Sequence, residues 1–334
     1  MQAAIYRRTG PAADVLRIEE RPVPSPEPGE VLVRISTSGI NPADVKRRAG
    51  WNGLSMSHAE VVPHCDGAGL IVQVGDGVDQ SRIGERVWLW NAQGGYGEVG
   101  RAFGTAAQFI AIEADQAVLL DDAMSFEEGA CLGVPAMTAW WAVHADGPVE
   151  GKTILVQGAA GAVGNCAAQI ARAGGARVIG TISSDTAADH VHSTGMIDLI
   201  NRNRQNVAEA VGKLTAHQGV DRIIEVDLAA NMEINAALIA PHGTIASYSS
   251  SSDPKPTLDY YAFANLGANL RFIQGFRIPA QARARGQKSL ATLAASKKLN
   301  IPIGQTFDLA DIAAAHERVE AGSIGNVVLR VSGQ

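Results

Sequence analysis

The three glycines of segment 157–164, QGAAGAVG, have the clearest potential for chemistry. They lie three residues apart, after the apolar run 153–157 and before an alanine-rich segment with the pattern of a helix over 165–173. Glycines at a strand-to-helix turn let an anionic diphosphate approach the backbone, where the N–H groups and the dipole of the helix attract it. A second apolar run follows at 177–183, so the spacing predicts a turn that binds the diphosphate of a dinucleotide. An ordinary tight turn is the alternative.

The end of the second apolar run indicates which dinucleotide binds. A site for NAD usually has Asp or Glu at this place, where the carboxylate binds the ribose 2′-hydroxyl. This chain has Ser183 and Ser184 there, and Asp185 follows. Because small hydroxyl side chains leave room for a 2′-phosphate and Arg202 could neutralise it, we predict NADPH. Asp185 leaves NADH open, and a solvated surface charge is the alternative for Arg202.

The elements that position this turn differ between the two parts of the chain. Before about residue 120, short apolar runs alternate with Gly and Pro, which predicts a compact antiparallel or barrel-like domain. These runs are 31–36, 70–74, 86–90 and 109–112.

The character of the chain changes near Asp122. Ser125 and Glu128 have the spacing of a capping box and predict a helix that continues to about Trp141. Strands and helices then alternate, which predicts a parallel sheet covered by helices. We expect strands at 153–157, 177–183, 198–200, 222–226 and 244–248, helices near 186–194, 205–217 and 231–240, and a final helix and strand at 308–321 and 326–331.

The composition of the chain excludes several classes of protein. With 334 residues, 46% hydrophobic and 19% charged, it has the size of two domains and is too apolar for a mainly disordered protein. Its 28 basic residues do not outweigh its 34 acidic ones, unlike those of a typical nucleic-acid binder. No run approaches the ~18 apolar residues of a membrane span. We therefore expect a soluble, cytoplasmic protein that binds neither nucleic acid nor membranes.

Four segments together resemble the medium-chain dehydrogenase/reductase superfamily, and specifically its zinc-free quinone oxidoreductase (zeta-crystallin-like) branch. They are GINPAD at 39–44, PHCDGAG at 63–69, GVPAMTA at 133–139 and QGAAGAVG at 157–164. The resemblance covers nearly the whole chain and implies an α/β fold with two domains. A Rossmann doubly wound parallel sheet would occupy 125–271, and a GroES-like β-rich catalytic domain would be formed by 1–124 and 272–334.

The resemblance also bears on zinc. Zinc alcohol dehydrogenases of this superfamily have Cys where this chain has Asn41, and their third ligand falls near Val134. They have His followed by Glu where this chain has Cys65 and Asp66. One potential ligand cannot hold a catalytic zinc, which needs three protein ligands and an open position. The resemblance therefore implies a metal-free site, and we expect Asp66 to stabilise its turn.

Residue by residue, the resemblance implies a cofactor site with four parts. It puts Asn41, Pro135 and Thr138 beside the nicotinamide, Ala160, Gly161, Ala162 and Val163 at the diphosphate, Ser183, Ser184 and Arg202 at the adenosine phosphate, and Ser247, Tyr248, Ser249, Phe272, Ile273, Gln274 and Asn326 at further cofactor contacts. Many members of the family have Lys at the position of Asn326.

Asn41, Lys46 and Trp51 are the candidate catalytic residues. Asn41 could bind the nicotinamide carboxamide or the substrate carbonyl, although Asn is also common in a turn before Pro. Lys46 could offer a proton or a positive charge to a developing enolate, and Trp51 could stack on a quinone ring. A solvated basic face and core packing are the respective alternatives. The family often has Tyr at the positions of Lys46 and Asn52, and Tyr96 is a further candidate proton donor.

The three cysteines, Cys65, Cys131 and Cys166, are interpreted as packing residues. Their odd number and wide spacing predict neither a disulfide framework nor a cysteine-rich zinc site. His64 next to Cys65 could suggest nucleophilic catalysis, but no third orienting group is evident in the sequence.

These features predict an NADPH-dependent, metal-free oxidoreductase. It would transfer hydride from C4 of the nicotinamide to a quinone or to the β-carbon of an α,β-unsaturated carbonyl, because such acceptors delocalise the incoming charge without a metal. The alternatives are an enoyl-thioester or alkenal reductase and a non-catalytic NADPH-binding protein. Relatives are commonly dimers or tetramers, so we expect a homo-oligomer, paired through the strand 244–248 or the stretch 272–276.

Overall fold

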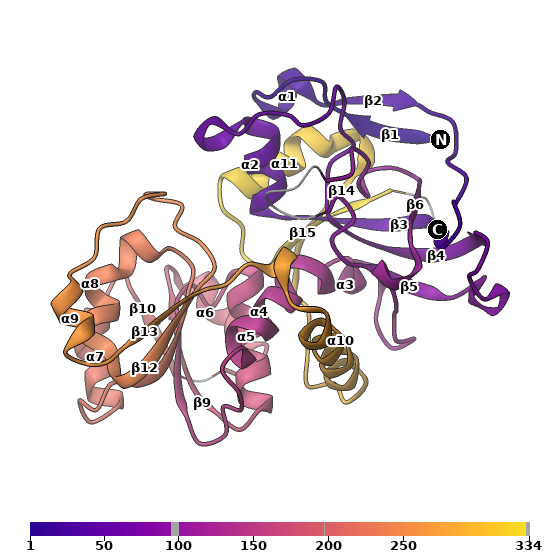
Figure 1. Ribbon diagram of the computed structural model, residues 1–334. Helices are drawn as coiled ribbons and strands as arrows, with labels where there is room; N and C mark the ends of the chain where they lie inside the picture. The colour runs from indigo at the N-terminus through magenta and orange to yellow at the C-terminus, as the bar shows by residue number, and fades with distance from the viewer. Residues whose placement is uncertain (95–99, 197, 332–334) are drawn as a thin grey trace. The chain divides into compact units, whose positions relative to one another are not determined.

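The computed structural model describes residues 1–94, 100–196 and 198–331. The chain divides into two compact units, and each contains its own large sheet (Figure 1). The first unit comprises Met1–Pro135, Gln287–Ala295 and Ile301–Gln334, and the second unit comprises Ala136–Gly286 and Ser296–Asn300. The predicted functional domain limits, 1–124 with 272–334 and 125–271, remain a prediction.

The first unit is built on a mostly antiparallel sheet of seven strands. The strand order is β14-β15-β3-β4-β5-β7, and β6 pairs with β3. The strands are β3 (Glu30–Ile40), β4 (Asp66–Val74), β5 (Arg86–Leu89), β6 (Phe109–Glu113), β7 (Ala117–Leu119), β14 (Ile303–Asp308) and β15 (Asn326–Arg330), and a separate pair is formed by β1 (Gln2–Ile5) and β2 (Arg17–Glu20). All four apolar runs predicted in this region are strands, which confirms an antiparallel domain.

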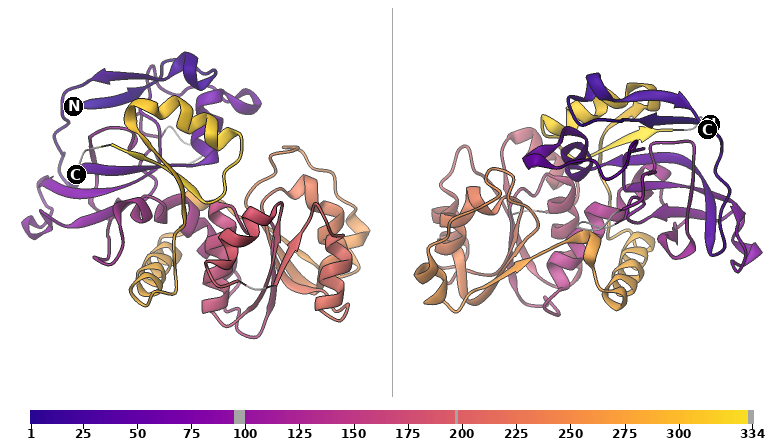
Figure 2. Two further views of the ribbon diagram at one scale, coloured as in Figure 1. Left: turned by 180° about the vertical axis from the view of Figure 1, so that it is seen from behind. Right: turned by 45° about the horizontal axis from the view of Figure 1, so that its top comes forward.

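The C-terminal part of the chain completes this sheet. β15 pairs antiparallel with the end of β3, with Val327 opposite Ile40, and β14 pairs parallel with β15. Figure 2 shows these segments, in yellow, among the N-terminal strands, in indigo. The helices of this unit are α1 (Ala12–Val15), α2 (Pro42–Ala49), α3 (Phe126–Gly129) and α11 (Ile312–Glu320). The predicted final helix thus begins at Ile312, after a short 3-10 turn.

The prediction of one continuous helix from Ser125 to about Trp141 is wrong in one respect: the structure has two α-helices with an interruption between them. Its start is confirmed, since the Ser125 hydroxyl accepts a hydrogen bond from the Glu128 amide at 3.1 Å and Glu128 accepts one from the Ser125 amide at 2.8 Å. After α3, the backbone widens into a π-helical turn, Leu132–Ala136, before α4 (Met137–His144) begins. Pro135 lies in this turn and has no N–H to continue an α-helical ladder.

The second unit is a fully parallel sheet of six strands. Its order is β10-β9-β8-β11-β12-β13. The strands are β8 (Thr153–Val156), β9 (Arg177–Ile182), β10 (Asp198–Asn201), β11 (Val220–Glu225), β12 (Ile239–Ser247) and β13 (Asn269–Phe272). Numbered within the unit this is the order 3-2-1-4-5-6 of the Rossmann fold, which confirms the predicted fold class. The strand order reverses between β8 and β11, so their carboxyl ends form the switch point at which such sheets bind ligands.

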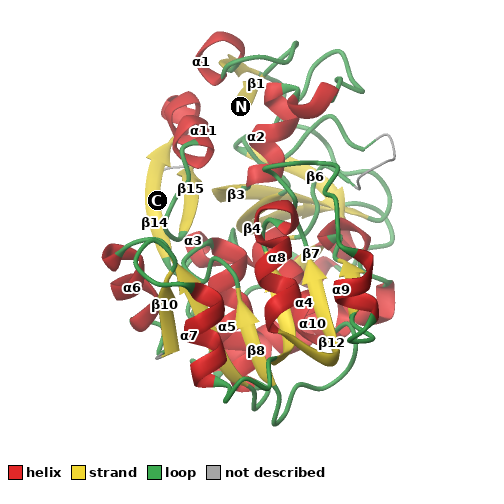
Figure 3. Cartoon of the chain, turned by 90° about the vertical axis from the view of Figure 1, so that its left-hand side faces the viewer, coloured by secondary structure: helices red, strands yellow, loops and turns green. Residues whose placement is uncertain are grey.

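Helices cover this sheet (Figure 3). They are α4, α5 (Ala162–Ala173), α6 (Asp185–His192), α7 (Val207–Leu214), α8 (Leu228–Leu238) and α9 (Tyr260–Ala264), and α10 (Ala280–Ala295) has residues in both units. The central strands are apolar on both faces, as a sheet covered twice requires: Leu155 and Ile223 on one face and Ile154 and Ile224 on the other are fully buried. In the described residues, no helix has the length and apolar character needed to span a membrane.

Candidate functional site

The glycine turn after β8 has the geometry of an anion site. Gly158 has a φ of +70°, which favours glycine, and a Cβ on Gly164 would lie 2.3 Å from the Gly158 carbonyl oxygen. Gly161 is the N-cap of α5 and supplies no capping side chain. The first N–H groups of an α-helix have no partner within the helix, so those of Ala162 and Val163 are available to an anion. The four residues predicted at the diphosphate, Ala160 to Val163, are thus brought together here.

The predicted adenosine-phosphate residues also meet. Ser183 follows β9, and Ser184 caps α6, with its hydroxyl accepting a hydrogen bond from the Ala187 amide at 3.1 Å. The turn after β10 is bound to the end of β9, because the Arg202 amide donates to the Ile182 carbonyl at 2.9 Å. Arg202 is exposed, and its guanidinium makes no hydrogen bond or ion pair with another described residue.

Asp185 is held by the same turn. Its carboxylate forms an ion pair with Arg204 at 2.8 Å and accepts a hydrogen bond from the Asn201 amide group at 3.4 Å. Asn203 donates to the Ser183 carbonyl at 2.8 Å and fixes the turn against β9. The acidic residue that left NADH open therefore already has a cationic partner, which no sequence pattern had indicated.

The remaining predicted cofactor residues of the second unit lie on adjacent segments. Ser247, Tyr248 and Ser249 end or follow β12, and the Ile273 amide donates to the Ser247 carbonyl at 2.7 Å. Gln274 accepts a hydrogen bond from the Phe276 amide at 3.4 Å. Burial raises the pKa of Tyr248 above its usual range.

Phe272 and Thr138 differ in exposure. Phe272 ends β13 with 73% of its surface exposed, whereas Thr138 is buried beside Gly275, where a Cβ would lie 2.1 Å from the Thr138 hydroxyl. Pro135 is buried in the π-helical turn of the first unit. Asn326 is also buried in that unit, and its amide group donates to the Pro302 carbonyl at 3.1 Å.

Asn41 is held by a carboxyl group that sequence reasoning interpreted only as a turn residue. Asn41 precedes α2, and its side-chain amide donates to Asp66 Oδ2 at 2.9 Å. Both Asp66 oxygens also lie 2.9 Å from the Val134 amide. A Cβ on Gly133 would lie 2.1 Å from Asp66 Oδ1, so only glycine lets the backbone approach this closely. One feature of the sequence could have indicated this role for Asp66. It follows Cys65 in segment 63–69, at the place where the related zinc enzymes have a metal ligand followed by Glu.

Burial governs the ionisation of this cluster. Desolvation raises the pKa of Asp66 well above its usual value and that of Asp44 to about 6, while Arg47 lowers the pKa of Asp44. Burial also raises the pKa of the Cys65 thiol, which disfavours the thiolate that a nucleophile needs. Within the described residues, no group of three or more His, Cys, Asp and Glu side chains is arranged to hold a metal ion.

Lys46 and Trp51 contact each other. Lys46 lies on α2, and its Nζ is 4.6 Å from the centroid of the Trp51 ring, which is a cation–π distance. Both side chains are partly exposed. One face of the indole therefore carries a positive charge. Tyr96 lies outside the described residues.

The ring nitrogens of His64 are hydrogen-bonded to Ser38 and to His316 of α11, so His64 is not placed as a base for the Cys65 thiol. Its Nε2 lies 2.9 Å from Nε2 of His316, and its Nδ1 lies 2.8 Å from the Ser38 hydroxyl. Both rings are fully buried. Cys65, Cys131 and Cys166 are buried free thiols, as expected of packing residues.

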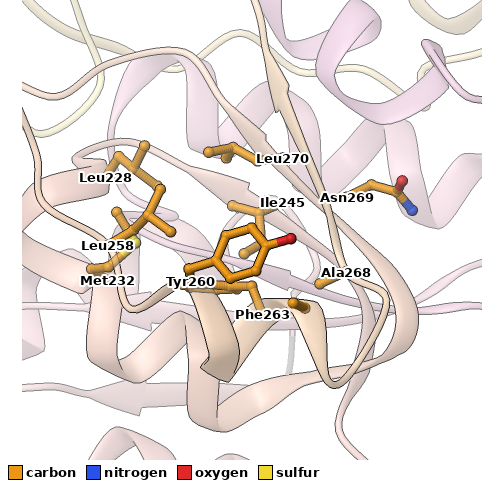
Figure 4. Close-up of a pocket in the computed structure, with 10 residues that line it drawn as sticks. Leu228, Met232, Ile245, Leu258, Tyr260, Phe263, Ala268, Asn269 and Leu270 are labelled. Carbon is orange, nitrogen blue, oxygen red and sulfur yellow. The ribbon is translucent and has the colours of Figure 1, made fainter.

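The second unit also has an apolar pocket away from the glycine turn. It has a volume of about 230 Å³ and lies between α8, α9 and the edge strand β13 (Figure 4). Tyr260, Phe263, Leu258 and Met232 contribute to its walls. None of the predicted cofactor residues lines it.

Comparison with known proteins agrees with the fold. Residues 27–122 match the family described as alcohol dehydrogenase GroES-like domain, and residues 162–295 match the family described as zinc-binding dehydrogenase. The human quinone oxidoreductase is 28% identical over 340 residues, covering 97% of this chain and 96% of that protein. The 2-haloacrylate reductase of a Burkholderia species is 29% identical and covers 98% of both chains.

A solved structure gives the same result for the whole fold. A mycobacterial protein in complex with NADPH has a TM-score of 0.85 and 26% identity, and the match covers 99% of this chain and 100% of that one. The strand order, the glycine turn and these likenesses lead to one conclusion: the chain is an oxidoreductase that belongs to the quinone oxidoreductase-like branch of the medium-chain dehydrogenase/reductase superfamily.

Proposed function

We propose that this protein is an NADPH-dependent, metal-free reductase that transfers hydride to quinones or α,β-unsaturated carbonyls. The observation that carries the proposal is the uncapped start of α5 at the switch point of the sheet, together with Arg202 beside the two serines after β9. An anion-binding turn and an exposed cation near small hydroxyl groups fit a dinucleotide with an additional 2′-phosphate. The solved relative in complex with NADPH supports this choice.

Each unit contributes a separate task. NADPH, when bound, supplies the hydride. In the second unit the start of α5 binds the diphosphate, and Arg202 neutralises the 2′-phosphate. In the first unit Asp66 orients the Asn41 amide, the group that we assign to a carboxamide or a carbonyl oxygen. Such fixed donors lower the barrier by orienting the reactants and by meeting the charge that develops on the acceptor.

The donor set favours chemistry without a metal. The positions of the zinc ligands in related enzymes hold the Asn41 amide, the buried thiol of Cys65 and the apolar Val134, so two of the three are not metal ligands. Simple alcohol oxidation usually relies on a metal to stabilise the alkoxide. Quinones and conjugated carbonyls spread the incoming charge over their own π-systems. The name of the Burkholderia relative favours a conjugated acid as a second acceptor class.

A panel of acceptors tests the proposal. We would follow NADPH and NADH oxidation at ~340 nm with a benzoquinone, phenanthrenequinone, an alkenal, a cyclic enone, 2-chloroacrylate and a simple aldehyde, and measure bound metals in the same preparation. Turnover of quinones or enones with NADPH and without stoichiometric zinc is the expected result. Nucleotide binding without turnover on any acceptor would instead identify a binding protein, and zinc that is required for activity would refute the metal-free mechanism.

We also propose that β13 pairs with β13 of a second copy. β12 occupies only one side of β13, and no described strand pairs with the other. Leu270 and Phe272 of this edge are exposed, and so are Tyr260 and Tyr261 of the neighbouring α9. Exposed apolar edge strands are normally paired or protected by charge, so a symmetric dimer is the simplest cover. The predicted cytoplasmic location remains part of this proposal.

A further inference from the structure

A chain of buried polar side chains joins the end of β11 to the glycine turn. It comprises Glu225, Asn235 of α8, Gln157 just after β8 and Thr181 of β9. All four are at most 3% exposed, although none belongs to the residues predicted to touch the cofactor. Polar groups this deep in a domain need hydrogen-bond partners, and each of the four side chains finds them in the next member of the chain.

The hydrogen bonds run in sequence from the turn to the carboxylate. The Gly158 amide donates to the Thr181 hydroxyl at 3.0 Å, which donates to Gln157 Oε1 at 2.9 Å. Gln157 Nε2 donates to Asn235 Oδ1 at 3.4 Å, and Asn235 Nδ2 donates to Glu225 Oε2 at 2.6 Å. Every donor therefore points towards Glu225.

The groups at the two ends of this series of hydrogen bonds, Gly158 and Glu225, determine the direction of donation. The Gly158 amide can only donate, and an ionised Glu225 can only accept, so the two side-chain amides and the hydroxyl between them have one orientation. Two further donors hold the other carboxylate oxygen, namely the Asn231 amide group at 2.9 Å and the Asp227 backbone amide at 2.5 Å. Burial raises the pKa of Glu225, and these donors oppose that rise. Aligned hydrogen bonds in a buried site also strengthen one another.

Glu225 holds the segment after β12 as well. Its backbone carbonyl accepts a hydrogen bond from the Tyr248 amide at 3.1 Å. The following acid, Asp227, accepts hydrogen bonds from Ser252 through the amide at 3.1 Å and the hydroxyl at 2.8 Å. The glycine turn and the serine-rich segment at 247–252 thus both depend on the residues that end β11.

We propose that Glu225 is a positioning residue for the dinucleotide, acting through Asn235, Gln157 and Thr181 on the Gly158 peptide. This inference rests on the proposed function of the glycine turn. These hydrogen-bonded side chains draw the Gly158 N–H into the sheet. They thereby hold Gly158 in its left-handed conformation and direct the amides of the following residues outwards. An anion then meets donors that need no reorganisation, as tight electrostatic binding requires.

Thr181 offers the sharpest test, because its hydroxyl links the side chains to the turn. Thr181→Val removes the hydroxyl and keeps the shape, whereas Thr181→Ser keeps the hydroxyl. We expect the Kd and KM for NADPH to rise at least about tenfold in Thr181→Val and to return towards wild type in Thr181→Ser. The kcat at saturating NADPH and the KM of the acceptor should change by less than about threefold, since neither depends on nucleotide affinity. Glu225→Gln should give the same pattern.

Gln169 provides a matched control. It is a buried amide of α5 in the same unit. Its side chain is hydrogen-bonded to Asn165 and Asn300 and not to Glu225, Asn235, Gln157 or Thr181. Gln169→Met should lower the melting temperature without changing the Kd for NADPH. If Thr181→Val folds and binds NADPH as tightly as wild type, or if Gln169→Met weakens binding equally, the positioning role is refuted. Failure of the wild-type protein to bind either nucleotide would instead refute the proposed function on which the inference rests.

Discussion

The Asp66 carboxylate and the Asn41 amide lie 2.9 Å apart, with Asp66 accepting, although the two residues are 25 positions apart in the sequence. The contact follows from the pairing of β3 with β4, in which Gly39 lies opposite Asp66. Because Asp66 holds the Asn41 Nδ2 group, the orientation of that amide is determined before any ligand arrives. Asp66 therefore orients Asn41, a role that the sequence pattern alone did not predict.

Replacing Asp66 should therefore act through Asn41. In Asp66→Asn, an amide N–H₂ replaces one oxygen, so one of the donors, Asn41 Nδ2 or the Val134 amide, loses its acceptor. We expect a loss of about 1–3 kcal/mol in the free energy of unfolding and a fall in kcat. Urea unfolding and steady-state kinetics measure the two effects.

A double-mutant cycle separates orientation from general damage. If Asp66 acts through Asn41, the kcat of Asn41→Ala with Asp66→Asn should be no lower than that of Asn41→Ala alone. Fully additive losses in kcat would show that the two residues act independently.

Much of the fold was predictable because its signals are local. The glycine spacing and the flanking apolar runs predicted the turn at 157–164, and the alternation of strands and helices predicted the parallel sheet. The capping box of Ser125 and Glu128 is likewise a short-range pattern. The helix that it starts ends early because Pro135 lies within the expected span, which weakens any continuous helix.

The parts that were missed depend on contacts between distant residues. His64 and His316 are 252 positions apart, and Gln157 and Asn235 are 78 apart. No periodicity reports such pairs, because strand register and helix rotation together decide which side chains meet. The ion pair of Asp185 and Arg204 also needs the turn after β10 to lie against β9. Local sequence patterns indicate which residues could take part in chemistry. They do not indicate which distant residues hold those side chains in place.

The buried pair of His64 and His316 should make the protein less stable in acid. Burial lowers the pKa of His64 to about 3 and that of His316 well below its usual value. In the unfolded chain an imidazole titrates near ~6.5, so below that pH the unfolded chain binds protons that the folded protein does not. The contribution of the pair is complete above ~6.5 and is lost as the pH falls towards the folded values.

The variant His316→Gln tests this sign. Relative to wild type, its free energy of unfolding should improve as the pH falls from about 7.5 to about 5.5, by up to about 1.4 kcal/mol per pH unit for the removed imidazole. Comparing the variant with wild type at each pH cancels the contribution of groups that do not contact His316. A difference that is constant over this range would contradict the prediction.

Asp44 should show the opposite dependence. Burial raises its pKa from 3.8 to about 6, so the folded protein keeps a proton that the unfolded chain releases. This contribution is complete below the unfolded pKa and is lost as the pH rises through about 6. Relative to wild type, Asp44→Asn should therefore gain stability as the pH rises from about 5 to about 7.5, apart from a constant loss for the weakened cap of α2. Urea unfolding at these two pH values measures the effect, and a relative loss at higher pH would contradict it.

The edge strand β13 gives a prediction about assembly. Leu270→Lys places a charge on the proposed dimer interface and should convert the protein to monomers, as measured by light scattering after gel filtration. Leu119→Lys is the matched control, because Leu119 is also an exposed leucine on a strand, β7 of the first unit. If both variants keep the mass of the wild type, β13 does not form the interface. A wild-type protein that is monomeric at all concentrations would contradict the proposed pairing directly.

The partner of Asp185 should set the choice between NADPH and NADH. Arg202→Ala removes the exposed cation and should lower the kcat/KM ratio of NADPH over NADH about tenfold or more. Arg204→Ala leaves Arg202 in place but frees the Asp185 carboxylate, which repels a 2′-phosphate and can bind a ribose 2′-hydroxyl. This variant should therefore also lose preference for NADPH. Adding Asp185→Asn should restore it, because the freed charge is then absent. If the double variant stays as impaired as Arg204→Ala, then Arg204 contributes its own charge to the phosphate rather than neutralising Asp185.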